Sequence, residues 1–576
     1  MRYFLKQSKI KKGLYLQIYE SHYIPGIGNR NRSYKTIGYY DDLVKSGIKD
    51  PLAHYQKVVD ELNLGIIENA DAQIGTISVN KNVGYFLLKA MLDSLDIDDT
   101  LKKMSMNKRF RFKVSDFLRT MIFAQVNNPS SKHMAWENVI PRLYGYDEST
   151  FSYDQILAGI EYMGSDYQKY IELFNKKISD NYCLNTSQIY FDCTNYYFEI
   201  DLPAEDKQKG PCKLGTHNPI IGQALMLDAN QMPIAMKMYP GNESEKPYLR
   251  ETIEDMKERF DIVGRVVQVA DKGLNCARNI YAAVIEADDG YIFSKSVHGT
   301  NLSDAEKKWV LLEDNYENAW SDVNDKDGKL LYRYKTCIDD FAYQCRLDPL
   351  SNKMTKFKVR EIRVVTFNPK LASKQLQQIN KEVDKALAKM SIKAASKSEY
   401  GDAVKYVNFT ANDENGEAID INTSLNIAKI EEDKKYAGYN LLVSSETNMH
   451  PRDIYKAYHG LWRIEESFRV MKSYLDARPV YLQKQDSIYG HFLINFLSLV
   501  TLRLLELNVF NDELPINQII KYIRDFNVTT NYDGSYINAS TKSSAYNVVK
   551  KRLGIAKIGN LYLKERDIRN IFNFEF

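Results

Sequence analysis

The segment from residue 181 to 298 carries an alternation of strand and helix signals that few folds can accommodate. Apolar runs bounded by turn residues predict three strands in succession, and a helix with Ser244 as its N-cap follows them. A fourth strand, a second helix and a fifth strand complete the predicted order. The strands are expected at residues 188–198, 220–227, 233–239, 265–270 and 291–294, and the second helix at residues 275–287.

Two of these strands carry acidic residues. Asp192 lies inside the first apolar run, and Asp271 directly follows the fourth. The order of elements matches a ribonuclease-H-like core, in which the first strand and the end of the fourth supply acids at neighbouring positions. An ionised carboxyl between Phe191 and Cys193 would be costly to bury without a partner. Asp271 has an alternative role as a turn or helix cap.

A third acid lies on a long helical pattern that begins at Pro451 and extends to about residue 475. At about 3.6 residues per turn, Tyr458, Glu465 and Lys472 lie almost two turns apart and share one row of the helix. That row is partly apolar and is expected to face the core. Glu466 is rotated by about 100° from it and is expected to face solvent or an arginine.

Three carboxylates brought together by a fold suit Mg²⁺, a hard cation that prefers oxygen ligands. Paired metals of this kind drive phosphodiester chemistry. A catalytic and metal-binding role for Asp192, Asp271 and Glu465 is therefore the leading hypothesis. The alternative for Glu465 is a salt bridge to Arg469, one turn later on the same helix.

Composition restricts the class of protein. The chain has 78 basic and 75 acidic residues, so the net charge of +3 makes no general case for a polyanion partner. The six cysteines form no Cys-x-x-Cys pair, which argues against a disulfide framework and a structural zinc. The N-terminus lacks an apolar signal segment. Asn495, Arg503 and Glu506 interrupt the most apolar stretch, which predicts a buried helix and a soluble, cytoplasmic protein.

The remaining regions are assigned from composition and pattern. Basic and aromatic residues are interleaved in the two N-terminal regions, where nucleic-acid contact and a solvated surface are equally open alternatives. The expected fold class is α/β: a mixed sheet with flanking helices, interrupted by a β-containing insertion without predicted chemistry. Strands are expected in the insertion at residues 330–336, 358–367 and 439–444. The predicted domains are a basic N-terminal region (1–75), a mainly helical DNA-binding domain (76–180), the first part of the core (181–298), the insertion (299–448), the last part of the core with the catalytic helix (449–510) and a C-terminal region (511–576).

Several segments resemble motifs of one protein family. Residues 458–472 resemble the Tyr-Arg-Glu-Lys signature of DDE transposases of bacterial insertion sequences, in the insertion-sequence-four superfamily. Residues 192–194 resemble the first-acid motif of that family, and residues 240–245 with 269–274 resemble its second-acid region. The resemblance covers both parts of the predicted core and implies that the three acids form a metal-binding triad.

The resemblance also implies contacts with DNA. Tyr458 and Lys472 would engage DNA near the scissile phosphate. Leu461 stands where the family signature has arginine, so that phosphate contact is missing or is supplied by Arg463 or Arg469. This departure bears on hairpin formation at a transposon end more than on hydrolysis. The residues assigned to DNA are Tyr458, Trp462, Arg463, Arg469, Lys472 and Lys213.

The function implied by the resemblance is transposition. Such a protein would bind the terminal inverted repeats of an insertion sequence, cleave DNA with two Mg²⁺ ions, or Mn²⁺ as a substitute, and join the 3′ ends to target DNA. Its partners would be double-stranded DNA and a second copy of the chain in a synaptic homodimer, with no membrane. The expected location is the bacterial cytoplasm, on the nucleoid when DNA is bound. A structure-specific nuclease without strand transfer and a non-catalytic DNA-binding protein are the open alternatives.

Overall fold

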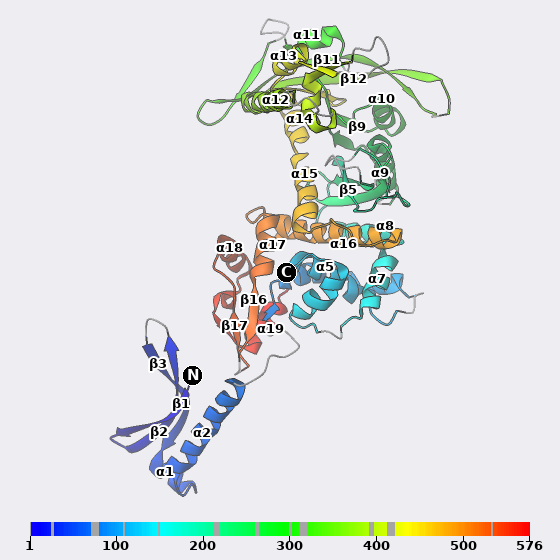
Figure 1. The fold of residues 1–576 in the computed structure, drawn as a ribbon. Coiled ribbons are helices and arrows are strands. Elements are labelled where there is room, and N and C mark those ends of the chain that lie inside the picture. The colour runs from blue at the N-terminus through cyan, green and yellow to red at the C-terminus, as the bar shows by residue number, and fades with distance from the viewer. Residues whose placement is uncertain are drawn as a thin grey trace. The chain divides into compact units, whose positions relative to one another are not determined.

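The computed structural model of the protein divides into two compact units, whose elements are labelled in Figure 1. The first unit comprises Met1–Phe86, Ile140–Thr150 and Tyr522–Phe574, and the second comprises Leu87–Val139, Phe151–Lys521 and Glu575–Phe576. The residues that the structure describes are 2–24, 28–70, 80–106, 110–147, 150–211, 218–259, 264–298, 302–311, 319–348, 350–390, 397–411, 421–531 and 534–576.

The first unit contains two antiparallel sheets. A three-stranded sheet lies in the predicted basic N-terminal region, and Tyr3, Ile18 and Val59 pack it against the helix that follows. The second sheet combines a strand from before the helical region with three C-terminal strands, in the order β18-β17-β16-β4. The elements are β1 (Arg2–Ile10), β2 (Gly13–Ile24), β3 (Gly28–Tyr39), α1 (Tyr40–Lys45), α2 (Pro51–Ala70), β4 (Asn80–Asn82), η2 (Ile140–Arg142), β16 (Asn527–Thr530), β17 (Tyr536–Asn538), α18 (Ser544–Leu553), η8 (Ala556–Gly559), β18 (Tyr562–Leu563) and α19 (Glu565–Phe572).

Helices from both ends of the second unit pack together. A long helix, α16 (Gln485–Leu504), lies against α5, α7 and α8, so part of the predicted N-terminal helical domain shares a core with a helix from beyond the insertion. The other helices of this layer are α3 (Phe86–Ser94), α4 (Asp98–Met104), α5 (Val114–Asn127), α6 (Lys132–Met134), η1 (Ala135–Val139), α7 (Tyr153–Gly164), α8 (Tyr167–Asn181), η7 (Leu505–Val509) and α17 (Ile516–Asp525).

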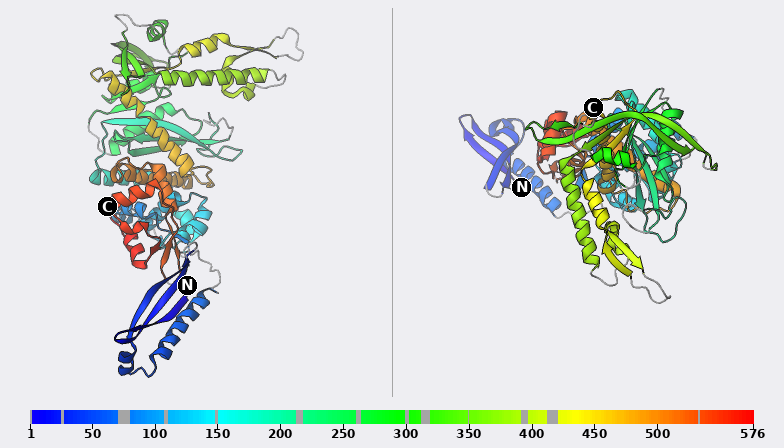
Figure 2. Two further views of the ribbon diagram at one scale, coloured as in Figure 1. Left: turned by 90° about the vertical axis from the view of Figure 1, so that its left-hand side faces the viewer. Right: turned by 90° about the horizontal axis from the view of Figure 1, so that it is seen from above.

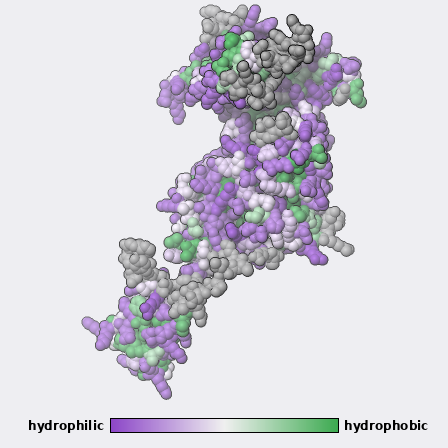
Figure 3. Space-filling view, viewed as in Figure 1, coloured by the Kyte–Doolittle hydropathy of each residue, from purple (hydrophilic) through white to green (hydrophobic). Residues whose placement is uncertain are grey.

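The helix α16 is apolar on every side and buried over most of its length. Together with η7 it is long and apolar enough to cross a membrane, and 83% of its most apolar window is buried inside the protein. Gly490 permits its close contact with α7, because a Cβ there would lie 2.1 Å from the carbonyl oxygen of Ile160. The predicted buried helix is confirmed, and the face drawn in Figure 3 is mainly hydrophilic.

The core predicted at residues 181–298 follows the predicted order of elements along the chain. Its central strands form a mixed sheet in the order β9-β8-β5-β6-β7, in which β5, β8 and β9 are parallel and β5, β6 and β7 form an antiparallel meander. The predicted second helix is a short α-helix continued by a π-helical turn. The elements are β5 (Gln188–Tyr197), β6 (Ile220–Leu227), β7 (Pro233–Pro240), α9 (Glu245–Arg259), β8 (Val267–Ala270), α10 (Ala277–Tyr281), η3 (Ala282–Glu286) and β9 (Gly290–Lys295).

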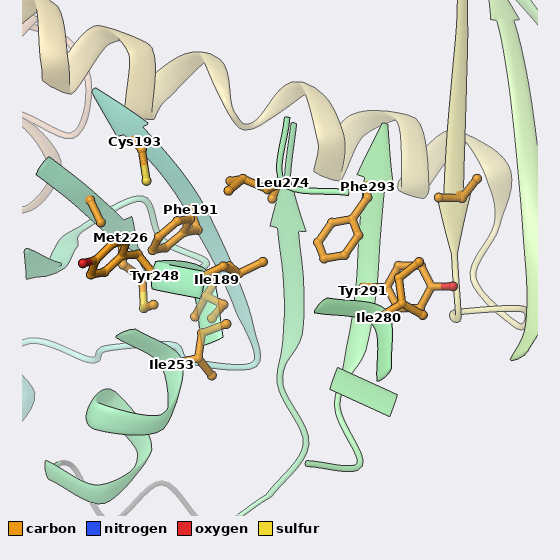
Figure 4. Close-up of a cluster of buried hydrophobic side chains, with 14 of the residues drawn as sticks. Ile189, Phe191, Cys193, Met226, Tyr248, Ile253, Leu274, Ile280, Tyr291 and Phe293 are labelled. Carbon is orange, nitrogen blue, oxygen red and sulfur yellow. The ribbon is translucent and has the colours of Figure 1, made fainter. Parts of the chain in front are cut away.

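The side chains of β5 alternate between two environments. Ile189, Phe191 and Cys193 belong to the buried apolar cluster that also takes in side chains of α9 and α10 (Figure 4). Tyr190 and Asp192 lie on the opposite face, because successive residues of a strand point to opposite sides. One face of β5 is therefore packed as core, and the other is available to the helix that carries Glu465.

The insertion extends the same sheet beyond β9. β15 (Tyr439–Ser444) pairs with β9, β12 (Met354–Phe367) with β15, and β11 (Leu330–Arg346) with β12, all antiparallel. β15 has the predicted bounds, whereas β11 and β12 are longer than predicted because their outer halves pair only with each other. The other elements are α11 (Asp304–Leu311), β10 (Ser321–Asn324), α12 (Pro369–Met390), η5 (Lys397–Tyr406), β13 (Val407–Ala411), β14 (Ile421–Leu425) and α13 (Ile427–Lys435).

The helix predicted from Pro451 to about residue 475 is divided into three segments that cross the sheet (Figure 2). At Gly460 the helix passes close to β5, since a Cβ there would lie 2.4 Å from the hydroxyl of Tyr190. The amides of Leu461 and Ile464 bond to carbonyls three residues back, so the backbone tightens into a 3₁₀-like turn. The helical pattern predicted from Pro451 to about residue 475 is present, but its interruption at Gly460 and Leu461 was not predicted, because local periodicity does not report the contact with Tyr190. The segments are α14 (Pro451–His459), α15 (Trp462–Arg469) and the π-helical η6 (Val470–Tyr474).

Candidate active site

Asp192 and Asp271 lie side by side on the sheet. The parallel ladder between β5 and β8 ends with Phe191 opposite Ala270, so the next residue on each strand is an acid. Paired residues of parallel strands point to the same face, and neighbouring strands are about 4.8 Å apart. Oδ1 of Asp192 accepts a hydrogen bond of 2.8 Å from the backbone N–H of Cys193. The structure thus brings together the two acids that the strand order placed at neighbouring positions.

Asp271 is held by two hydroxyl groups. Ser294 Oγ and Tyr458 OH both donate to its Oδ1, over 2.8 and 2.9 Å. Ser294 lies beside it on β9, and Tyr458 reaches it from α14. Burial raises the pKa of Tyr458, and the negative charges of Asp271 and Glu465 raise it further, so the phenol stays protonated and donates. These bonds fix the orientation of the carboxylate through one of its oxygens.

Glu465 lies in the first turn of α15, and its charge acts on Tyr458. Its side chain is exposed. Among the described residues Glu465 forms no salt bridge, so the alternative of an ion pair with Arg469 is absent from this structure. Glu465 therefore shares the electrostatic surroundings of Asp271 without being neutralised by a side chain of α15.

The three acids do not form a closed cluster. In the part of the chain that the structure describes, no three His, Cys, Asp or Glu side chains are close enough together to hold a metal ion. The donor set fits a divalent cation of the Mg²⁺ type, because all three groups offer oxygen. The neighbouring thiol of Cys193 belongs to the apolar cluster on the opposite face of the strand, which excludes sulfur from the set. Asp192, Asp271 and Glu465 therefore offer the donor type that such a cation prefers, although in this structure they do not gather into a set that could hold it.

Lys472 places a positive charge on the same face as Asp192. Its Nζ donates to Oγ1 of Thr194 and lies 5.0 Å from the ring centroid of Tyr196. Asp192, Thr194 and Tyr196 alternate along β5 and so share one face of the strand. The π-helical turn η6, which widens the helix at this point, carries Lys472 onto the strand.

Glu466 points away from these acids and joins a cluster of ion pairs. Arg463 lies 3.0 Å from Glu466, 3.6 Å from Glu506 and 2.8 Å from Asp512. Arg503, which is fully buried on α16, lies 3.3 Å from Glu466 and also pairs with Glu506. Glu466 faces arginines, which was one of its two expected orientations. The expectation that the row of Glu465 faces the core does not hold at Glu465, which is exposed, whereas Glu466 is the more buried of the two glutamates. The guanidinium of Arg463 is committed to carboxylates of its own chain, so its assignment to DNA is not favoured by this geometry.

Trp462 borders a groove beside α14 with a volume of about 800 Å³. The indole is 51% exposed, and the groove also contains the stacked rings of Tyr332 and Tyr455, whose centroids are 3.9 Å apart. Arg452 and Lys456 add positive charge to its lining. Exposed aromatic rings beside basic side chains suit contact with nucleic acid.

Two further residues were assigned to DNA from the sequence. Arg469 is exposed on α15, in the turn after Glu465. Lys213 lies outside the described residues.

The sequence reading missed two polar side chains of the site. Ser294 was placed at the end of a predicted strand without a role, although its hydroxyl binds Asp271. Thr194 lies in the first-acid motif but had no predicted role, although its hydroxyl oxygen accepts a hydrogen bond from Lys472. Their signal in the sequence was a hydroxyl at the end of a strand or on the same face as an acid, which is too common to single out a site.

Comparisons with known proteins were made by sequence and by structure. Residues 201–501 match the family model described as the transposase DDE domain. The match covers more than half of the chain and includes Asp271 and Glu465, whereas Asp192 lies shortly before its first residue. No curated protein sequence matches the chain.

Among solved structures, a cryo-EM structure of a piggyBac transposase synaptic complex with hairpin DNA aligns with 11% sequence identity. The alignment covers 86% of this chain and 84% of that chain, with a TM-score of 0.36. A similarity at this level supports no conclusion about the present fold. The family model is sufficient by itself: the chain belongs to the transposases with a DDE domain.

Proposed function

We propose that this transposase binds the terminal inverted repeats of an insertion sequence, cleaves DNA phosphodiester bonds with two divalent metal ions and joins the 3′ ends to target DNA. The observation that carries the proposal is the placement of Asp192 beside Asp271, below a helix that presents Glu465. The sheet order β7-β6-β5-β8-β9, a meander followed by parallel strands, supports a ribonuclease-H-like core.

Each side chain of the site has a defined part in this proposal. Asp192, Asp271 and Glu465 would hold Mg²⁺, with Mn²⁺ as a substitute. When bound, two such ions activate the attacking water and stabilise the leaving 3′ oxygen. Tyr458 keeps Asp271 in one orientation. Lys472 supplies a positive charge on the face of Asp192, where it can bind a phosphate of the DNA strand.

The proposed partner is double-stranded DNA, both as transposon ends and as target. Because two ends must be joined in one reaction, we propose a homodimer in the synaptic complex. The location proposed with this activity is the bacterial cytoplasm, on the nucleoid. End recognition is proposed for residues 1–180, where basic and aromatic side chains are interleaved.

The test is cleavage of a duplex that ends in the inverted repeats flanking the gene. Cleavage is expected with Mg²⁺ or Mn²⁺ and is expected to disappear in chelator. Asp192→Asn and Asp271→Asn are each expected to abolish cleavage while DNA binding is retained, because binding depends on phosphate contacts elsewhere. Asp453→Asn, at an acid in the first turn of α14, is the matched control. Undiminished cleavage in chelator would exclude the metal-dependent mechanism.

The two alternatives differ from the proposal in their products. A structure-specific nuclease would cleave the duplex but would not join its 3′ end to a target plasmid. A non-catalytic DNA-binding protein would bind the ends without cleaving them at any metal concentration. A strand-transfer assay on the same preparation therefore separates the three functions.

A further inference from the structure

A pocket of about 780 Å³ lies beside the carboxyl end of β5, within the second unit. The Arg478 guanidinium carbon, on its wall, lies 5.7 Å from the ring centroid of Tyr197, the last residue of β5. The walls come from the start of α6, from the segment after η6 and from α16. We name it the Lys132 pocket, and its lining includes Lys132, His133, Asp476, Arg478 and His491.

Lys132 is a buried ammonium group with a neutral partner. It is 6% exposed, and its Nζ donates to Oε1 of Gln125 over 3.1 Å. The amide nitrogen of Gln125 is itself bound to the carbonyl of Leu475, which fixes the orientation of the glutamine. In the described part of the chain no carboxylate pairs with Lys132. An ammonium group has three donors, and burying its charge without an anion is costly.

A second buried polar group lines the same pocket. His491 is 5% exposed, and its Nε2 lies 3.2 Å from the carbonyl oxygen of Ala477. Its Nδ1 is buried and has no hydrogen-bond partner among the described residues. Native proteins rarely leave such atoms unsatisfied, so an orphaned nitrogen beside an uncompensated ammonium points to a ligand.

The charges around the pocket favour an anion. Arg478 forms no salt bridge within the described ranges, whereas His133 lies 3.7 Å from Glu137. Asp476 is the acid of the lining and is exposed to solvent. Burial lowers the pKa of Lys132 to about 8, so the ammonium form still predominates at neutral pH. Two cations therefore face the cavity against one solvated carboxylate.

We infer that the Lys132 pocket binds a phosphate group of the DNA strand that passes the candidate active site, an inference that rests on the proposed function. A phosphate offers acceptors both to the remaining donors of Lys132 and to the planar fork of Arg478. The ammonium of Lys472 lies 5.0 Å from the ring centroid of Tyr196, and the positive charge of Arg478 also acts on that tyrosine, so the two cations connect the face of the acids with the pocket. This continuity favours a strand phosphate over a free anion.

The experiment measures the affinity of the full-length protein for a labelled DNA duplex at several salt concentrations, in chelator. Lys132→Met keeps the length of the side chain and removes its charge. Binding is expected to weaken about tenfold, and the slope of log K against log salt is expected to fall by about one. The Tm is expected to stay the same or rise, because an uncompensated buried charge is removed. Lys374→Met, at an exposed lysine of α12 in the same unit, is the control.

If Lys132→Met folds poorly, the same DNA affinity is measured with Arg478→Gln, which changes the half-buried arginine of the pocket wall. Unchanged affinity and slope in the folded variants would overturn the inference. Inorganic phosphate and deoxyadenosine monophosphate test the other source of the same chemistry. If either raises the Tm of the wild type but not of Lys132→Met, while DNA affinity is unchanged, the pocket binds a free anion and the assignment to a DNA strand is wrong. DNA binding that depends on Lys132, in a protein that never cleaves, would support the pocket and refute the proposed function.

Discussion

The two sides of α15 carry acidic residues in opposite electrostatic settings. On one side Glu466 contacts Arg463 and Arg503, and its side chain is only 15% exposed. On the other side, Glu465 is exposed and Asp271 is bound by hydroxyl groups, and neither forms a salt bridge in the described part of the chain. Adjacent glutamates thus differ in burial and in the charge of their partners.

The difference shows which carboxylates the protein neutralises by itself. A buried carboxylate is costly unless a cation or several donors accompany it, and Arg503 meets that need for Glu466 and Glu506. Hydroxyl donors orient Asp271 without cancelling its charge. In the described part of the chain no salt bridge balances the charges of Glu465 and Asp271, which suits the proposed metal site.

The largest expected effect separates the two adjacent glutamates. Glu465→Gln removes a proposed metal ligand on the exposed side, and cleavage is expected to fall on the order of 10³-fold or more, because metal assistance is worth several kcal/mol. The Tm is expected to stay at the wild-type value, since Glu465 has no buried partner to lose. Cleavage rates with Mg²⁺ and a thermal melt are the measurements. Full activity in this variant would mean that the third ligand is misplaced.

A substitution in the ion cluster around Glu466 is expected to lower the free energy of unfolding and to leave cleavage unchanged. Arg503→Met leaves Arg463 as the remaining partner of Glu466 and Glu506 among the described residues. A loss of about 3–5 kcal/mol in the free energy of unfolding is expected, because one partner of a buried ion cluster is removed. Denaturant unfolding measures the loss, and activity per folded molecule is expected to persist. Arg469→Met, at an exposed arginine of α15, is the matched control. An unchanged midpoint for Arg503→Met would show that the ion cluster is not needed for folding.

Glu466→Gln, in the same ion cluster, is expected to lower the free energy of unfolding by less than Arg503→Met does. An exposed ion pair, of the kind that a solvent-facing Glu466 would form, is worth under about 1 kcal/mol. In the structure Glu466 is largely buried between two arginines, so a loss of about 1–3 kcal/mol is expected. Cleavage by the folded variant is expected to stay close to wild type. If the Glu466→Gln protein is stable but does not cleave DNA, Glu466 and not Glu465 belongs to the proposed metal site.

The smallest expected effect concerns the hydroxyl that orients Asp271. Tyr458→Phe removes one of the two bonds to Oδ1 and leaves Ser294 in place. A hydrogen bond to a charged group is worth about 1.5–3 kcal/mol, and the remaining bond offsets part of the loss, so cleavage is expected to fall about tenfold. The rate at saturating DNA is the measurement. A fall as large as that of Glu465→Gln would mean that Tyr458 has a direct part in the chemistry.

Much of the core could be predicted from local patterns. The strands at residues 220–227 and 439–444 were predicted with the bounds that β6 and β15 have in the structure. The rotation of Glu466 away from Glu465 also followed from helical spacing alone. The course of the helix at Gly460 could not be predicted, because it depends on Tyr190, which is far away in the sequence.

The sequence by itself determined the order of the core elements and the positions of Asp192, Asp271 and Glu465 on them, because strand alternation and helical periodicity are local properties. Only the tertiary structure decided which groups accompany those acids. Tyr458 binds Asp271 across 187 residues, and Arg503 neutralises Glu466 across 37. The pairing of β15, β12 and β11 onto the edge of β9 is likewise non-local. Contacts of this kind depend on how distant segments pack, and no periodicity within a single segment records them.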